Sequence, residues 1–193
     1  MKMKNARKTI IFIIALMFLF GNVISSAYGY QYYPNASLKM RLSTRSGPGT
    51  EYDEPGTFFN NNWQKQTVTV MGKHWDGNIW WVLVDFTNGK QAYRVWTGLK
   101  RVNVNLDAVP EILSIGQGTV SATETRRGPG GSYAAGPRIN HWQDVVAYGW
   151  ENGYVEVEYW DSGIVYRVWV PESTVSIDAY IPGTDGEYYP LIR

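Results

Sequence analysis

Alternating apolar and polar positions predict strands in the chain after residue 29. Val155, Val157 and Tyr159 alternate with Glu156 and Glu158. A period of two is typical of a strand with one buried and one solvated face. We therefore expect the three apolar side chains to point inward and the two carboxylates to lie in water.

A second stretch, Trp80 to Phe86, is apolar at nearly every position. Alternation does not say which of its side chains face inward, so the pattern leaves a second face that can pack against another part of the protein. Short β-branched runs before Gly72 and Gly149 predict two further strands that end at these glycines. Hairpin turns are predicted at four dipeptides, Asp76-Gly77, Asn88-Gly89, Asn152-Gly153 and Ser162-Gly163.

No stretch after residue 29 keeps apolar residues at helical spacing for three turns. The chain has 9 Trp, 14 Tyr and 20 Gly in 193 residues, a composition that favours short strands and tight turns. We therefore predict an all-β protein.

Two marks occur twice in the same order. The first is Thr44, Arg45, Ser46, Gly47, Pro48, Gly49 and Tyr52, repeated as Thr125, Arg126, Arg127, Gly128, Pro129, Gly130 and Tyr133; the second is the string 93–96, Tyr-Arg-Val-Trp, repeated as 166–169. From the first glycine of the first mark to the tyrosine of the second there are 46 residues in one copy and 38 in the other. One unit is therefore repeated with loops of different length.

The repeat divides the chain. We expect a signal peptide at 1–29, an N-terminal segment at 30–38, modules at 39–105 and 115–178, a linker at 106–114 and a tail at 179–193. A module of about 65 residues buries only about 60% of its unfolded surface and is marginal alone. A small closed or nearly closed barrel would remove strand edges, so the expected fold is two tandem small barrels.

The first 29 residues are typical of a secretory signal. Lys2, Lys4, Arg7 and Lys8 precede an apolar run at 10–20 and small residues at 25–27. The run is about half the length that spans a bilayer, so we expect a cleaved signal and a secreted protein, with no membrane contact afterwards. Without the four basic residues, the 18 Lys and Arg fall to 14 against 17 Asp and Glu, and this acidic balance argues against nucleic acid as a partner.

The repeated strings resemble the bacterial SH3 domain family. The resemblance lies in Arg45-Ser46-Gly47-Pro48 with Tyr52, in the Val68-Thr69-Val70 strand with Gly72, and in the strand beginning at Trp80; the second copy is similar at 126–133, 145–149 and 154–159. It implies two tandem SH3-like barrels that bind peptidoglycan peptides and so associate with the cell wall. The chain departs from the family where Arg94-Val95-Trp96 and Arg167-Val168-Trp169 replace the usual Gly-Trp-Val, which would reshape any groove.

Six aromatic residues are candidates for ligand binding. In the resemblance Tyr52, Trp80, Tyr133 and Tyr154 line a groove, although their alternative role is to close the barrel core. Trp75 and Trp150 fall at predicted turns, where burial is hard to arrange, and are better candidates. Arg94 and Trp96, two apart on one strand, are expected to form a cation–π pair within their module, as are Arg167 and Trp169.

The residues give no sign of catalysis. His74 and His141 do not occupy matching positions in the repeat, and no pair of acids recurs. The chain has no cysteine, so disulfides and thiol chemistry are excluded; no metal-ligand spacing is visible, and no cofactor is expected. We predict a non-catalytic module that binds peptidoglycan, or alternatively one that docks a secreted or surface protein through the stretch 80–86. The sequence carries no signal for oligomeric state.

Overall fold

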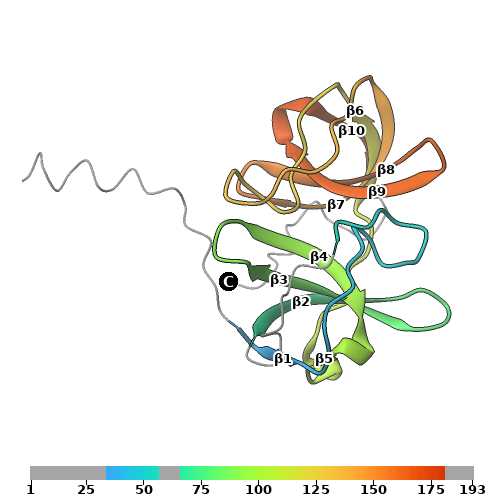
Figure 1. Ribbon diagram of the computed structural model, residues 1–193. Coiled ribbons are helices and arrows are strands. Elements are labelled where there is room, and N and C mark those ends of the chain that lie inside the picture. The colour runs from blue at the N-terminus through green and yellow to red at the C-terminus, as the bar shows by residue number, and fades with distance from the viewer. Residues whose placement is uncertain (1–33, 57–65, 181–193) are drawn as a thin grey trace, which may run out of the picture. The chain divides into compact units, whose positions relative to one another are not determined.

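Two antiparallel sheets form the part of the chain that the computed structural model describes, residues 34–56 and 66–180 (Figure 1). The first sheet contains β1 (Ala36–Leu38), β2 (Thr67–Trp75), β3 (Trp80–Thr87), β4 (Ala92–Gly98) and β5 (Val102–Asn103). The second contains β6 (Gly116–Val120), β7 (Gln143–Glu151), β8 (Tyr154–Asp161), β9 (Ile164–Pro171) and β10 (Val175–Tyr180). The expected signal peptide at 1–29, the start of the N-terminal segment and the tail beyond 180 lie outside the described residues.

The two sheets have the same topology. Their strand orders are β4-β3-β2-β1-β5 and β9-β8-β7-β6-β10, so each strand of the first sheet has a counterpart five numbers later. A 3-10 turn precedes the last strand of each sheet, η2 (Leu99–Arg101) and η4 (Glu172–Thr174). The duplication in the sequence is therefore a duplication of topology, and we call the two copies the first and second modules.

The all-β prediction is confirmed: in the described ranges the helical elements are 3-10 turns of three residues. The sheets are open, however, since the outer strands of each described sheet, β4 and β5 or β9 and β10, are not neighbours. The two sheets lie within one compact unit of the chain.

The four predicted hairpin turns are confirmed. Asn152 and Gly153, with φ of 52° and 75°, join β7 to β8; Ser162 and Gly163, at 52° and 89°, join β8 to β9. These positive values are those of the tight turns that suit the twist of antiparallel strands. The prediction that strands end at Gly72 and Gly149 is wrong, because β2 and β7 continue through a bulge at each glycine.

Each sheet packs its own apolar core on one face. The first core contains Leu42, Val68, Val82, Val84, Phe86 and Val95, and the second contains Ile139, Val145, Val155, Val157, Tyr159 and Val168. The expected inward set Val155, Val157 and Tyr159 is thus confirmed.

The module boundaries extend beyond the predicted ones. β1 begins at Ala36, within the segment expected to precede the first module, and β10 continues past residue 178 to Tyr180. The predicted linker contains η3 (Leu106–Ala108) and is tied to β2, because Lys73 donates its backbone N–H to Pro110 and Ile112 donates to Lys73. Val109 and Ile112 are buried. Over the described ranges, the structure contains no helix with the length and hydropathy of a membrane span.

Candidate functional site

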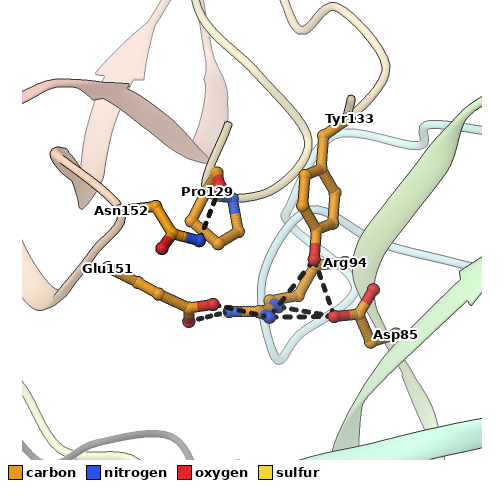
Figure 2. A network of polar contacts seen from close by, with 6 residues as sticks. All are labelled: Asp85, Arg94, Pro129, Tyr133, Glu151 and Asn152. Atoms are coloured by element: carbon orange, nitrogen blue, oxygen red, sulfur yellow. Dashed lines mark hydrogen bonds and ion pairs between the residues drawn. The ribbon is translucent and has the colours of Figure 1, made fainter. Parts of the chain in front are cut away.

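Arg94 is the centre of a polar network built from both modules (Figure 2). Its Nε and Nη2 donate to Oδ2 of Asp85 at 3.1 and 2.8 Å, across the β3–β4 pair. Tyr133 of the second module donates its hydroxyl to the same Oδ2 at 2.8 Å, and Nη1 of Arg94 bonds Glu151 at 2.5 Å. Asp85 and Arg94 are 4% and 6% exposed, so two charges are held away from water by contacts across the module boundary.

Arg167 repeats this arrangement in the opposite direction. Its Nε and Nη2 donate to Oε2 of Glu158 at 3.1 and 2.8 Å, across the β8–β9 pair. Tyr52 of the first module donates its hydroxyl to the same oxygen at 2.7 Å. Each module thus supplies an arginine and a carboxylate from neighbouring strands and receives a tyrosine from the other module.

The cation–π pairs also cross between modules. The guanidinium of Arg94 lies 5.5 Å from the ring centroid of Trp169, and that of Arg167 lies 5.5 Å from Trp96. The prediction of cation–π pairs within each module is therefore wrong. Alternation does place Arg94 and Trp96 on one face of β4, but that face meets the second module, so each tryptophan packs against the other copy's arginine.

The duplicated loops that carry these tyrosines are held by strands of both modules. Arg45 exchanges backbone hydrogen bonds with Trp96 of β4 in its own module, while Asp53 donates to Val165 of β9 in the other. In the second copy Arg126 pairs with Trp169 in the same way, and Ala134 donates to Ala92 of β4. The repeated motif is therefore a docking loop between the modules.

The first glycine of each motif is required by the tyrosine and not by the turn. A Cβ at Gly47 would lie 2.1 Å from the ring of Tyr52, and a Cβ at Gly128 would lie 1.9 Å from the ring of Tyr133. Positive φ, the expected reason for these glycines, is absent from Gly47 and Gly128 and occurs only at Gly130 among the described motif glycines.

Burial and charge together set the protonation of the network. Burial alone would lower the pKa of Arg94, but the neighbouring Asp85, Tyr133 and Glu151 raise it well above its ordinary range. Burial raises the pKa of both Tyr52 and Tyr133 far above the usual value. Their hydroxyls thus remain protonated donors across the whole range in which the protein is studied.

The two networks differ at one matching pair of positions. Counted from the bulge glycines, Glu151 matches His74, so the carboxylate that holds the outer nitrogen of Arg94 has no equivalent beside Arg167. Arg167 Nη1 and His74 Nδ1 are both buried without a hydrogen-bond partner. Arg167 instead stacks on Tyr148, whose ring centroid is 3.5 Å away.

The second strand face of β8 was predicted wrongly. Glu156 and Glu158 were expected in water, yet Glu156 is 3% exposed and the Glu158 side chain 19%. The two arginines explain this reversal, since both attract Glu156 and Arg167 pairs with Glu158. Acids do recur in the repeat, because Asp85 and Glu158 occupy the same position opposite Arg94 and Arg167.

The apolar stretch from Trp80 to Phe86 packs on both faces. Val82, Val84 and Phe86 enter the first core, while Trp81 and Leu83 join a third cluster with Met71, Trp96, Ile112 and, partly buried, Tyr148 of the second module. All six residues from 81 to 86 are buried. The strand through which a partner protein was expected to dock is thus covered by the protein itself.

Among the predicted ligand residues, Trp75 and Trp80 lie together at the β2–β3 hairpin. Trp75 is 44% exposed, and its ring lies 5.4 Å from Trp80 at an angle of 53°. Asp76 fixes the turn between them by accepting hydrogen bonds from the backbone of Asn78 and Ile79 and from Trp81 Nε1. Hydrogen bonds from the backbone of Ile79 and from Trp81 lower the pKa of Asp76, so the turn holds at any pH above the ordinary range of an aspartate. The hairpin presents an aromatic platform on a fixed turn.

The other four candidates lie elsewhere. Tyr52 and Tyr133 are buried between the modules, at 9% and 5% exposure. Trp150 is partly buried against the second core, and Tyr154 is half-buried at the start of β8. Trp75 and Trp150 belong to strand ends, not to turns, and by register Trp150 matches Lys73.

Sequence reasoning missed a groove in the second module. It has a volume of about 610 Å³ and is lined by Gln117, Gly118, Asp144, Val145, Val146, Glu158, Tyr159, Trp160 and Val165. Trp160 is 67% exposed. The signal that points to it is the exposed tryptophan on an otherwise well-packed strand, which the Tyr-Trp string at 159–160 does not distinguish from a buried pair.

Comparisons of the chain with protein-family models, with curated proteins and with solved structures returned no match. Within residues 34–56 and 66–180, no three His, Asp or Glu side chains come together as a set of metal ligands. The site must therefore be interpreted from its own geometry.

Proposed function

We propose that the two modules are SH3-like barrels and that the chain is a secreted, non-catalytic protein that binds peptidoglycan peptides of the bacterial cell wall. The resemblance of the repeated motifs to bacterial SH3 domains suggests the ligand class. The observation that carries the proposal is the Trp75–Trp80 platform, an exposed aromatic pair on a turn fixed by Asp76.

The distribution of polar groups supports binding. The arginines, carboxylates and tyrosines of the repeat are engaged with one another between the modules. The aromatics that remain exposed, Trp75, Trp142 and Trp160, supply rigid contact area at low entropic cost. A scaffold locked by its own conserved-charge network keeps these surfaces at fixed positions.

The platform would act as a stacking surface. Lys73 Nζ lies 5.4 Å from the Trp80 centroid and occupies part of that ring, so the exposed Trp75 is the face left for a ligand. Peptide groups or sugar rings of the wall polymer would stack on it, and weak single contacts would gain strength from the many repeats of the polymer.

The test is retention of a chain beginning at residue 30 on isolated cell walls. We expect retention, and a loss of about tenfold in Trp75→Ala, the change that corresponds to about 1.4 kcal/mol. Trp75→Phe should restore most of the retention, and Trp142→Ala is the matched control because Trp142 is also exposed, at 62%, but lies outside the platform. Retention no greater than that of a protein without wall affinity would reject the function, and capture of one surface protein instead would favour the docking alternative.

A further inference from the structure

The groove of the second module lies on the sheet face opposite the core. Val145 and Tyr159 contribute their side chains to the second core. Because side chains alternate along a strand, Asp144 and Val146 of β7 and Glu158 and Trp160 of β8 belong to the other face.

Strand register brings the groove residues into rows. Gln117 pairs with Val146, and Val146 pairs with Glu158, which forms one row across β6, β7 and β8. Trp160 pairs with Val165 of β9. The floor is therefore apolar at its centre, with polar side chains and a tryptophan around it.

The charges that line the groove have one sign. Asp144 and Glu158 are both carboxylates, and no lysine or arginine is among the lining residues in the described chain. The guanidinium of Arg167, paired to Glu158, belongs to a residue only 4% exposed. Charge complementarity favours a cation.

Three of the lining side chains are free to bind. Asp144 and Gln117 are exposed, and neither makes a side-chain hydrogen bond or ion pair with another described residue. The exposed ring of Trp160 likewise has no ring or cation contact with the described residues. An indole face is the aromatic surface that attracts cations most strongly.

We propose that this groove binds a primary ammonium group carried by a peptide, such as the side chain of lysine or another diamino acid. Trp160 stacks on the ammonium and its methylene chain, Asp144 forms the ion pair, and the amide oxygen of Gln117 accepts a further hydrogen bond. Val146 and Val165 contact the aliphatic part of the side chain. The site is separate from the Trp75–Trp80 platform and does not depend on wall binding.

The experiment titrates Nα-acetyl-lysine amide into the isotope-labelled chain and follows backbone amide shifts by NMR. We expect saturable shifts in β7, β8 and Val165, and none with Nα,Nε-diacetyl-lysine amide, which lacks the charge. Trp160→Ala should weaken binding about tenfold and Asp144→Asn about fivefold, the loss expected for a partly exposed ion pair.

Two matched variants serve as controls. Trp142→Ala removes a tryptophan of similar exposure outside the groove, and Asp107→Asn removes an exposed carboxylate of η3; neither should change the affinity. Equal shifts with the diacetylated compound, or unchanged affinity in Trp160→Ala and Asp144→Asn, would overturn the proposal. Saturable binding of a neutral chito-oligosaccharide in the groove, with no response to the lysine compound, would also overturn it. Because Trp160→Ala leaves the platform intact, its wall retention reports separately on the proposed function.

Discussion

Arg94 of the first module stacks on Trp169 of the second, with its guanidinium carbon 5.5 Å from the ring centroid. The same relation joins Arg167 to Trp96 in the reverse direction. Because each arginine lies on the same face of its strand as a tryptophan that it does not stack on, neither module completes this contact alone. The repeat therefore encodes mutual docking of its two copies.

The tyrosine hydroxyls should contribute to stability through the carboxylates they satisfy. Tyr133→Phe leaves Asp85 with one donor fewer, and Tyr52→Phe does the same to Glu158. We expect each to lower the free energy of unfolding by about 1–3 kcal/mol, the usual effect of an unsatisfied buried group. Urea denaturation measures this. Tyr166→Phe is the control, since this ring stacks on Tyr159 and its hydroxyl has no partner among the described residues; an equal loss there would contradict the assignment.

Removing Arg94 alone should be much worse than removing it together with its partner. Arg94→Met leaves Asp85 charged and buried, at an expected cost of about 3–5 kcal/mol. The double variant Arg94→Met with Asp85→Leu should recover most of that loss, as measured by a denaturation double-mutant cycle. The exposed pair Arg138–Glu124 provides the comparison, and Arg138→Met should cost at most about 1 kcal/mol. A double variant as unstable as the single would show that the pair is not isolated in this way.

The motif glycine should not tolerate a methyl group. In Gly128→Ala the new Cβ would meet the Tyr133 ring at 1.9 Å, and we expect a loss of about 1–3 kcal/mol from overpacking. Gly131→Ala, three residues on and with no atom within 4 Å of its Cβ, should change stability by about 0.5 kcal/mol or less. Thermal unfolding of the two variants decides between close packing and a general need for glycine in the loop.

Glu156 should make stability depend on pH. Burial raises its pKa above the ordinary value of 4.5, against the attraction of Arg167 and Arg94. A carboxyl with a raised folded-state pKa binds its proton more tightly in the folded protein, so its contribution is present below pH 4.5 and is lost as pH rises through the folded-state value. We expect Glu156→Gln to gain stability relative to the natural chain as pH rises from 4 to 7. A stability difference that is constant over that range would contradict a raised pKa.

Local signals in the sequence predicted the strands and turns well. Asn152-Gly153 and Ser162-Gly163 adopt the positive φ angles that their residue types favour, and Val155 to Tyr159 faces the core as its alternation indicates. The repeat of Arg, Gly, Pro and Tyr correctly marked two copies, which share one strand order.

What failed were the inferences that needed a partner surface. Glu156 was expected in water because alternation describes one buried face, whereas β8 is covered on both. Arg94 was paired with Trp96 because their spacing is local, yet its true partners are distant in sequence. The equivalence of Asp85 and Glu158 was hidden because one is aspartate and the other glutamate, and only the strand register reveals it.

The central claim is that the repeated motif joins the two modules into one cooperative unit. The most direct test is urea unfolding of the chain from residue 30, followed by NMR signals from β3–β4 and from β8–β9 in the same samples. The claim predicts one shared midpoint in the natural chain, and in Arg94→Met a lower midpoint that is again the same for both modules. Two separate transitions in the natural chain, or a shift in Arg94→Met confined to the first module, would contradict it.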